Sequence, residues 1–238
     1  MYLKELKSLF HSMIAYLVIA LFLTGIGLYV WVFHPNVFDG EEADMSLVFQ
    51  VTPYIFMFLI PAITMRSFSE EMREGTLELI FTKPISEWNI VLGKFFACAT
   101  LVLIALAPTL VYYFSLSQLA TPTGNIDSAQ VMGSYVGLFL LSLSFTAIGI
   151  WTSSLTKNQI ISFILSLFLC LMFYEGLKYI GDLIPQGIVS YFMANASLAQ
   201  QYNSLSIGVL DLRNIIFILS VTVFFLAVTK LKLSSRKW

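Results

Sequence analysis

The stretch RSFSEEMREGTLELIFTK (residues 66–83) stands between long apolar runs and is followed directly by Pro84. Placed on a helix at about 100° per residue, it gathers its four glutamates on one face. The opposite face carries Phe68, Met72, Gly75 and Leu79. Ser67 or Ser69 is a candidate N-cap residue, and the proline ends the helix. We therefore expect one amphipathic helix over residues 67–83, with an exposed acidic face formed by Glu70, Glu71, Glu74 and Glu78.

The rest of the chain is too apolar for a water-exposed surface. Of its 238 residues, 58% are hydrophobic and only 11% are charged, whereas soluble domains carry roughly 25% charged residues. Because only helices and closed barrels satisfy the backbone within lipid, and no alternating pattern indicates a barrel, we expect an all-α polytopic membrane protein. It forms a single membrane domain over residues 1–238 with six spans. The expected spans are Met13–Phe33, Leu47–Met65, Lys94–Leu116, Gly133–Leu155, Ile160–Tyr174 (extending toward Ile180) and Asn214–Val228.

Lysines and arginines predict the orientation. With the N-terminus inside, only two bases, Lys178 and Arg213, fall in outer segments. Since positive residues gather on the cytoplasmic side, both termini and the acidic helix are predicted to be cytoplasmic. The inner bases are Lys4, Lys7, Arg66, Arg73, Lys83, Lys94, Lys157, Lys230, Lys232, Arg236 and Lys237.

Two further segments border the spans. Residues 1–12 alternate apolar and basic positions in a helical manner, which predicts an amphipathic helix on the cytoplasmic surface. Residues 181–212 are too polar to span and too apolar for a free loop, which favours an outer re-entrant or interfacial helical hairpin between spans 5 and 6. Prolines 53, 61 and 108 predict kinks or local unwinding inside spans 2 and 3.

The fourth span carries a stripe of small residues at helical spacing. Such a stripe allows another helix to approach closely. It can serve packing within one subunit or a seam between two copies, and the pattern does not favour either. The stripe is Gly133, Gly137, Ser142, Thr146 and Gly149, and Ser153 continues it.

The sequence lacks the motifs expected for nucleotide hydrolysis, metal binding or nucleophilic catalysis. It has no GxxxxGK[ST] phosphate loop, no histidine and cysteine spacing typical of a metal site, and no base placed to activate a serine. We therefore expect no catalytic residue, cofactor site or metal site, and no binding to nucleic acid. Glu175 and Lys178 are expected to form an interfacial ion pair where span 5 leaves the membrane core, and a role in a transport path is the alternative. No ionisable group is expected near the middle of a span.

Lipid is a poor binding partner for the acidic helix, and a protein is a better one. The inner leaflet is anionic and attracts bases at about 1 kcal/mol each, so an acidic helix is poorly suited to it. A protein with basic groups would offset the repulsion among the glutamates, while Leu77, Ile80 and Phe81 would insert into a groove on that protein. The alternative is a solvated helix that binds nothing.

At these residues the chain resembles the ABC-2-type transporter permeases. RSFSEEMREGTLELIFTKPIS, followed by WNIVLGKF, is similar to their segment between spans 2 and 3, and the likeness is greatest to the gliding-motility-associated permeases of the GldF type. SYVGLFLLSLSFTAIGIWTSSLTKNQI and SLAQQYNSLSIGVLDLRNIIFILS extend the resemblance over almost the whole chain. Gln201 and Tyr202 stand where members of this group often have a His-Phe pair, so a role ascribed to that histidine does not carry over.

The resemblance implies a permease subunit that pairs with a second copy or a companion membrane subunit and docks separate ATPase subunits. ATP and Mg²⁺ would then bind to the partner, and the whole would sit in the cytoplasmic membrane and drive export or gliding motility. A membrane anchor or assembly platform is the main alternative, and an ATP-independent carrier is the other. The expected docking residues are Glu70, Glu71, Arg73, Glu74, Gly75, Thr76, Leu77, Glu78, Ile80 and Phe81.

Overall fold

The computed structural model describes residues 1–33, 45–82, 85–120, 126–185, 187–208 and 211–235. Within these ranges the chain is built from helices, and six of them are long and apolar enough to cross a membrane. The prediction of an all-helical protein with six spans is confirmed. The spans are formed by α2 (Met13–Trp31), α3 (Ser46–Thr64), α6 with α7 (Glu87–Leu106 and Leu110–Leu119), α8 (Ser128–Leu155), α9 (Gln159–Leu171) with the helical turns that extend it to Leu183, and α13 (Leu212–Ser234).

Shorter elements connect the spans. Helix α1 (Tyr2–His11) precedes the first span, and α4 (Ser69–Glu74) and α5 (Thr76–Phe81) join the second to the third. A π-helical turn (Met172–Gly176), α10 (Leu177–Leu183), α11 (Ile188–Asn195) and α12 (Leu198–Ser206) lie between α9 and α13.

Two features of the third span bear on the sequence expectations. Pro108 sits in a 3₁₀ turn (Ala107–Thr109) that separates α6 from α7, which is the local unwinding expected of a proline in a span. The span also begins earlier than expected, at Glu87, because the hydroxyl of Ser86 caps the helix by accepting a hydrogen bond from the Asn89 amide. Lys94 therefore lies two turns inside α6 instead of at its start.

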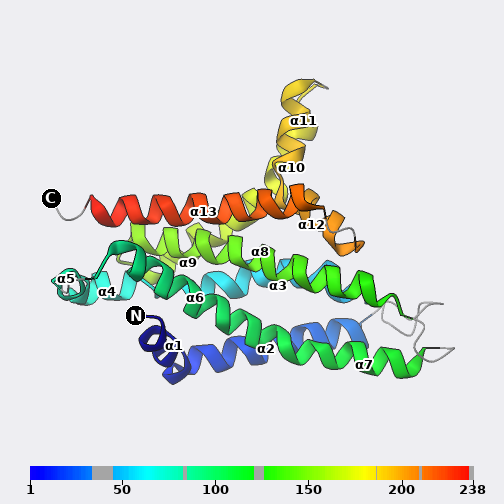
Figure 1. Cartoon of the computed structure of the whole chain (residues 1–238), viewed down its shortest axis with the longest axis horizontal. Helices are drawn as coiled ribbons and strands as arrows, with labels where there is room; N and C mark the ends of the chain where they lie inside the picture. The colour runs from blue at the N-terminus through cyan, green and yellow to red at the C-terminus, as the bar shows by residue number, and fades with distance from the viewer. Residues whose placement is uncertain (34–44, 83–84, 121–125, 186, 209–210, 236–238) are drawn as a thin grey trace.

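Helix α8 is the centre of the bundle. It packs against α3, α6, α9, α12 and α13, and its whole C-terminal half is largely buried. Polar side chains join it to its neighbours, as where the Ser144 hydroxyl lies 3.0 Å from the Thr222 hydroxyl of α13. Figure 1 shows α8 running through the middle of the molecule, with α13 on one side and α2 and α7 on the other.

The small-residue stripe of α8 is used inside the chain. A Cβ atom on Gly133 would come within 3.1 Å of Gly208 Cα, and one on Gly137 within 2.9 Å of Leu205 Cβ, so these glycines admit the α12 segment. A Cβ atom on Gly149 would overlap the Thr64 hydroxyl of α3. Ser142 and Thr146 are buried as well. The stripe thus provides close helix packing within one chain.

The segment between spans 5 and 6 divides into two parts. Helices α10 and α11 pair with one another, since Gly181 packs on the backbone of Ser190 and Ala194. Figure 1 shows this pair projecting sideways from the bundle, whereas a re-entrant hairpin would fold back into it. Only α12 lies against the bundle, with Tyr202 and Leu205 buried on α8. Helix α11 has no buried residue, whereas α12 has four.

The start of the chain and the C-terminal end of α13 lie at the same end of the bundle as α4 and α5 (Figure 1). At this end α1 also packs against α6.

Candidate functional site

The acidic segment forms two short helices, so the expectation of one helix over residues 67–83 is wrong. Helix α4 ends at Gly75, whose φ of 72° is left-handed, and α5 starts at the next residue. Glycine adopts this conformation without the steric penalty of a side chain, and it commonly ends helices in this way. Neither Ser67 nor Ser69 caps α4, because its N-cap residue is Phe68 and makes no side-chain capping bond. Residues 83 and 84 lie outside the described ranges.

The bend changes which side chains face outward. On a continuous helix Leu79 would share the buried face of Phe68 and Met72, yet it is 64% exposed. Leu77 and Ile80, which were expected to insert into a partner, are instead buried in the chain's own core. The reason is that Gly75 resets the helical phase, so a face extrapolated from α4 does not continue in α5. The outward surface consists of Arg73, Glu74, Gly75, Glu78 and Leu79.

A serine of α8 forms hydrogen bonds with the backbone at the start of α4. The Ser153 hydroxyl accepts hydrogen bonds from the amides of Phe68 (2.9 Å) and Ser69 (3.1 Å) and donates one to the Met65 carbonyl (3.0 Å). These backbone groups lie where α3 has ended and α4 has not yet formed its own ladder, so they need outside partners. The α4–α5 segment is thereby fixed to α8, the best-packed helix of the bundle.

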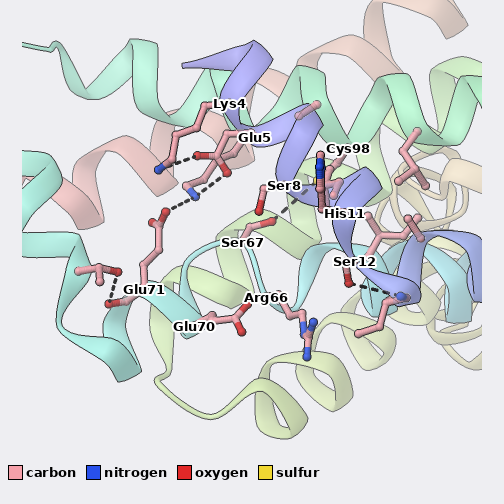
Figure 2. Close-up of a pocket in the computed structure, with 18 of the residues that line it drawn as sticks. Lys4, Glu5, Ser8, His11, Ser12, Arg66, Ser67, Glu70, Glu71 and Cys98 are labelled. Carbon is pink, nitrogen blue, oxygen red and sulfur yellow. Dashed lines mark hydrogen bonds and ion pairs between the residues drawn. The ribbon is translucent and has the colours of Figure 1, made fainter.

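A buried lysine joins three separate elements beneath this surface. Lys94 of α6 is 2% exposed, and its ammonium lies 2.8 Å from Glu71 Oε1 of α4 and 3.1 Å from Glu5 Oε2 of α1. The same ammonium stands 5.1 Å from the ring centroid of buried Phe68, which is within the range of a cation–π interaction. Figure 2 shows Glu5 and Glu71 reaching toward one another from opposite sides of the site.

One glutamate of the predicted acidic face, Glu71, belongs to this buried group of ion pairs. Glu71 points inward to Lys94, while Glu74 and Glu78 are exposed and Glu70 lies 4.0 Å from Arg73. Two carboxylates share one ammonium, and Lys4 is 3.9 Å from the second oxygen of Glu5. Because a buried charge without a partner is very costly, the three side chains hold α1, α4 and α6 together.

Sequence reasoning missed the role of Lys94 because the residue was expected at the start of span 3, among the cytoplasmic bases. One signal was available, namely a lone lysine within an apolar helical run, since such a lysine must find a carboxylate when it is buried. Glu5 lies 89 residues away in the sequence, so the identity of that partner could not have been inferred.

A pocket of about 600 Å³ opens beside this group. Its walls come from α1, the end of α3, α4 and α6, and it is polar near Glu70 and Arg66 and apolar near Ile63 and Leu101. Figure 2 shows Ser8, His11 and Ser12 of the α1 region on one side and Ser67 and Glu70 on the other. The Ser67 hydroxyl and the Cys98 thiol, which both line the pocket, are 3.8 Å apart.

The arrangement offers contact surfaces. Among the described residues, no group of three histidine, cysteine, aspartate or glutamate side chains could hold a metal ion. The site instead combines an exposed acidic rim, one exposed leucine, and internal bonds that connect the rim to α1, α6 and α8. Such a surface suits the binding of another protein and the transmission of its movement.

Fold and site together define a multi-pass helical membrane protein with a rigidly supported contact surface at one end of its bundle. The chain belongs to the ABC-2 family of transporter proteins, whose family model matches residues 39–234. It is thus a membrane-spanning permease component of an ABC transporter, a class that works with a separate ATPase subunit. A comparison with curated proteins finds no match.

Proposed function

We propose that α4 and α5, here named the docking segment, bind a separate ATP-hydrolysing subunit on the cytoplasmic side of the membrane. The observation that carries this proposal is the exposed surface of Arg73, Glu74, Gly75, Glu78 and Leu79, which is held from beneath by Ser153 and Lys94. Because this surface is already fixed, it does not lose conformational entropy by becoming ordered when a partner binds. The partner would offer basic side chains to the two glutamates and an apolar hollow to Leu79.

The internal bonds support a mechanical role for the segment. A push on α4 acts on α6 and α1 through Lys94, and on α8 through Ser153. Packed helices transmit such a displacement because their interiors are dense and poorly compressible. We propose that closure of the partner subunits around ATP and Mg²⁺, both bound by the partner, moves these helices together and so drives transport.

The test is charge reversal on the exposed rim. Tagged chain is purified from the membranes of the organism that encodes it, and ATP hydrolysis by the co-purified material is measured. Wild type should retain an ATPase, and a Glu74→Lys, Glu78→Lys double variant should lose most of it. Both glutamates are exposed, and neither forms an ion pair with another described residue, so the double variant should insert and fold normally.

The matched control is Asp182→Lys, which reverses an exposed carboxylate on α10, far from the docking segment along the chain. It should retain the ATPase at the wild-type level. Full retention of the ATPase by the Glu74→Lys, Glu78→Lys variant would overturn the proposed docking surface.

We further propose that the chain works in the cytoplasmic membrane beside a second copy or a companion membrane subunit, in export or in gliding motility. The segment at residues 66–86 supports this through its likeness to the GldF-type permeases. A membrane anchor that moves no cargo would show an ATPase rate in proteoliposomes that no added cargo changes.

A further inference from the structure

A carboxylate lies beside the centre of the second span. The Tyr54 hydroxyl donates a 2.6 Å hydrogen bond to Glu175 Oε1, and Tyr54 stands at the middle of α3 (Ser46–Thr64). The expectation that no ionisable group would lie near the middle of a span therefore does not hold. Glu175 belongs to the π-helical turn Met172–Gly176, and such turns are frequent at functional sites.

The expected ion pair between Glu175 and Lys178 is not formed. Lys178 is exposed one turn further along, and within the described ranges no basic side chain makes an ion pair with Glu175. One oxygen of the carboxyl group accepts the hydrogen bond from Tyr54. An ionisable side chain at this depth is expensive in lipid, and in membrane proteins it typically faces a cavity, a pathway or a charged group.

The surroundings of this carboxylate suit a cation. Tyr54 is 48% exposed, and its ring packs edge-on to the buried Tyr174 ring at 5.8 Å. Exposed Phe58 follows Tyr54 by one turn on α3, and exposed Leu171 precedes Glu175 by one turn. Aromatic faces attract cations, and most strongly where water is scarce. The surface thus combines one carboxyl group with apolar and aromatic area.

We propose that Glu175 and Tyr54 form a membrane-embedded binding site for a positively charged group carried by an apolar molecule. Glu175 supplies the counter-charge, Tyr54 orients the carboxylate, and the flanking apolar side chains receive the hydrophobic body of the ligand. The proposal deepens the proposed function, because a site at this depth is where a permease meets its cargo. The binding step is tested on the permease alone, so a failure of ATPase docking leaves it testable.

The test measures equilibrium binding of tetraphenylphosphonium to the full chain in lipid nanodiscs. Tetraphenylborate has nearly the same shape and the opposite charge, so it reports binding through apolar area alone. Wild type should bind the cation saturably and more tightly than the anion. Glu175→Gln should weaken cation binding at least about tenfold, and Tyr54→Phe a few-fold, as expected for the loss of a charged and a neutral hydrogen-bonding group.

The control variant is Asp182→Asn, which neutralises an exposed carboxylate on the next helix and should leave cation binding unchanged. A second measurement does not depend on a variant that folds. The lipophilic reagent dicyclohexylcarbodiimide modifies carboxyl groups within membranes, and its attachment to Glu175 is followed by mass spectrometry. Tetraphenylphosphonium should slow this modification and tetraphenylborate should not.

Three results would overturn the proposal. One is the absence of saturable cation binding by wild type, and another is equal affinity of wild type and Glu175→Gln. The third is equal protection of Glu175 by the cation and the anion, which would mean that the ligand covers an apolar surface without using the charge.

Discussion

At the scale of single residues, the site depends on groups that are costly to bury alone. Lys94 is balanced by carboxylates from two other helices, so its removal leaves both of them in a dry environment. Lys94→Met should therefore lower the free energy of unfolding by about 3–5 kcal/mol. The measurement is detergent-titration unfolding of purified chain.

Lys157→Met is the control for that measurement, because Lys157 is an exposed lysine between α8 and α9. Its effect should stay within about 0.5 kcal/mol. Equal unfolding free energies of the Lys94 and Lys157 variants would contradict the assignment of Lys94 as the group that holds α1, α4 and α6 together.

A second residue prediction concerns the hydroxyl that fixes the turn before α4. Ser153→Ala leaves the amides of Phe68 and Ser69 without their partner, which should cost about 1–3 kcal/mol of unfolding free energy. Ser142→Ala is the matched control, since Ser142 is equally buried on α8 but bonds the Phe139 carbonyl of its own helix. Thermal unfolding in detergent should separate the two variants, and coincident melting curves would argue against the turn-holding role of Ser153.

These residues also mark how far the sequence can predict a site. The glutamates of the acidic segment were identified from their number and spacing, and Glu74 and Glu78 are exposed as expected. Glu71 and Lys94 were assigned to solvent because their pairing joins helices that are distant in the sequence. Glu175 was misplaced for the same reason, since its hydrogen-bond partner Tyr54 lies 121 residues away.

At the scale of elements, the docking segment depends on its bend. Gly75 is left-handed and a Cβ atom there would meet no neighbouring atom within 4 Å, so a larger residue is disfavoured by backbone conformation alone. Gly75→Ala should lower the free energy of unfolding by about 1–2 kcal/mol if the bend is kept. The alanine also favours a straight helix, which would rotate Glu78 and Leu79 away from their present positions. We expect reduced ATPase co-purification. Gly75→Asn should retain more of it, because asparagine tolerates the left-handed region better.

Some helices and bends could be predicted from the sequence and others could not, for a physical reason. The six spans follow from hydropathy, because lipid imposes helices of a minimum apolar length. The interruption at Pro108 follows from local chemistry. The bend at Gly75 and the outward course of α10 and α11 depend on which neighbours are present, and an apolar pattern such as that of α11 does not say what will cover it.

At the scale of the whole molecule, the proposed function requires the docking segment to share a compartment with ATP. Figure 1 places the start of the chain and the C-terminal end of α13 at the same end of the bundle as α4 and α5, and the distribution of lysine and arginine predicts that this end faces the cytoplasm. The native cysteines, Cys98 and Cys170, are buried, so single cysteines introduced at exposed positions can report the orientation. Intact cells are treated with a membrane-impermeant maleimide before and after permeabilisation.

Lys7→Cys and Lys157→Cys should react only after permeabilisation, whereas Ala129→Cys, exposed at the other end of α8 from Lys157, should react in intact cells. The native chain provides the background signal. The reverse pattern would place the docking segment outside the cell, where no ATPase could use it, and would exclude the proposed function even if a protein co-purified. The expected pattern, by contrast, places α1, α4 and α5 where one cytoplasmic partner can reach all three, which is the arrangement that the Lys94 linkage requires if it is to carry the partner's movement into the membrane.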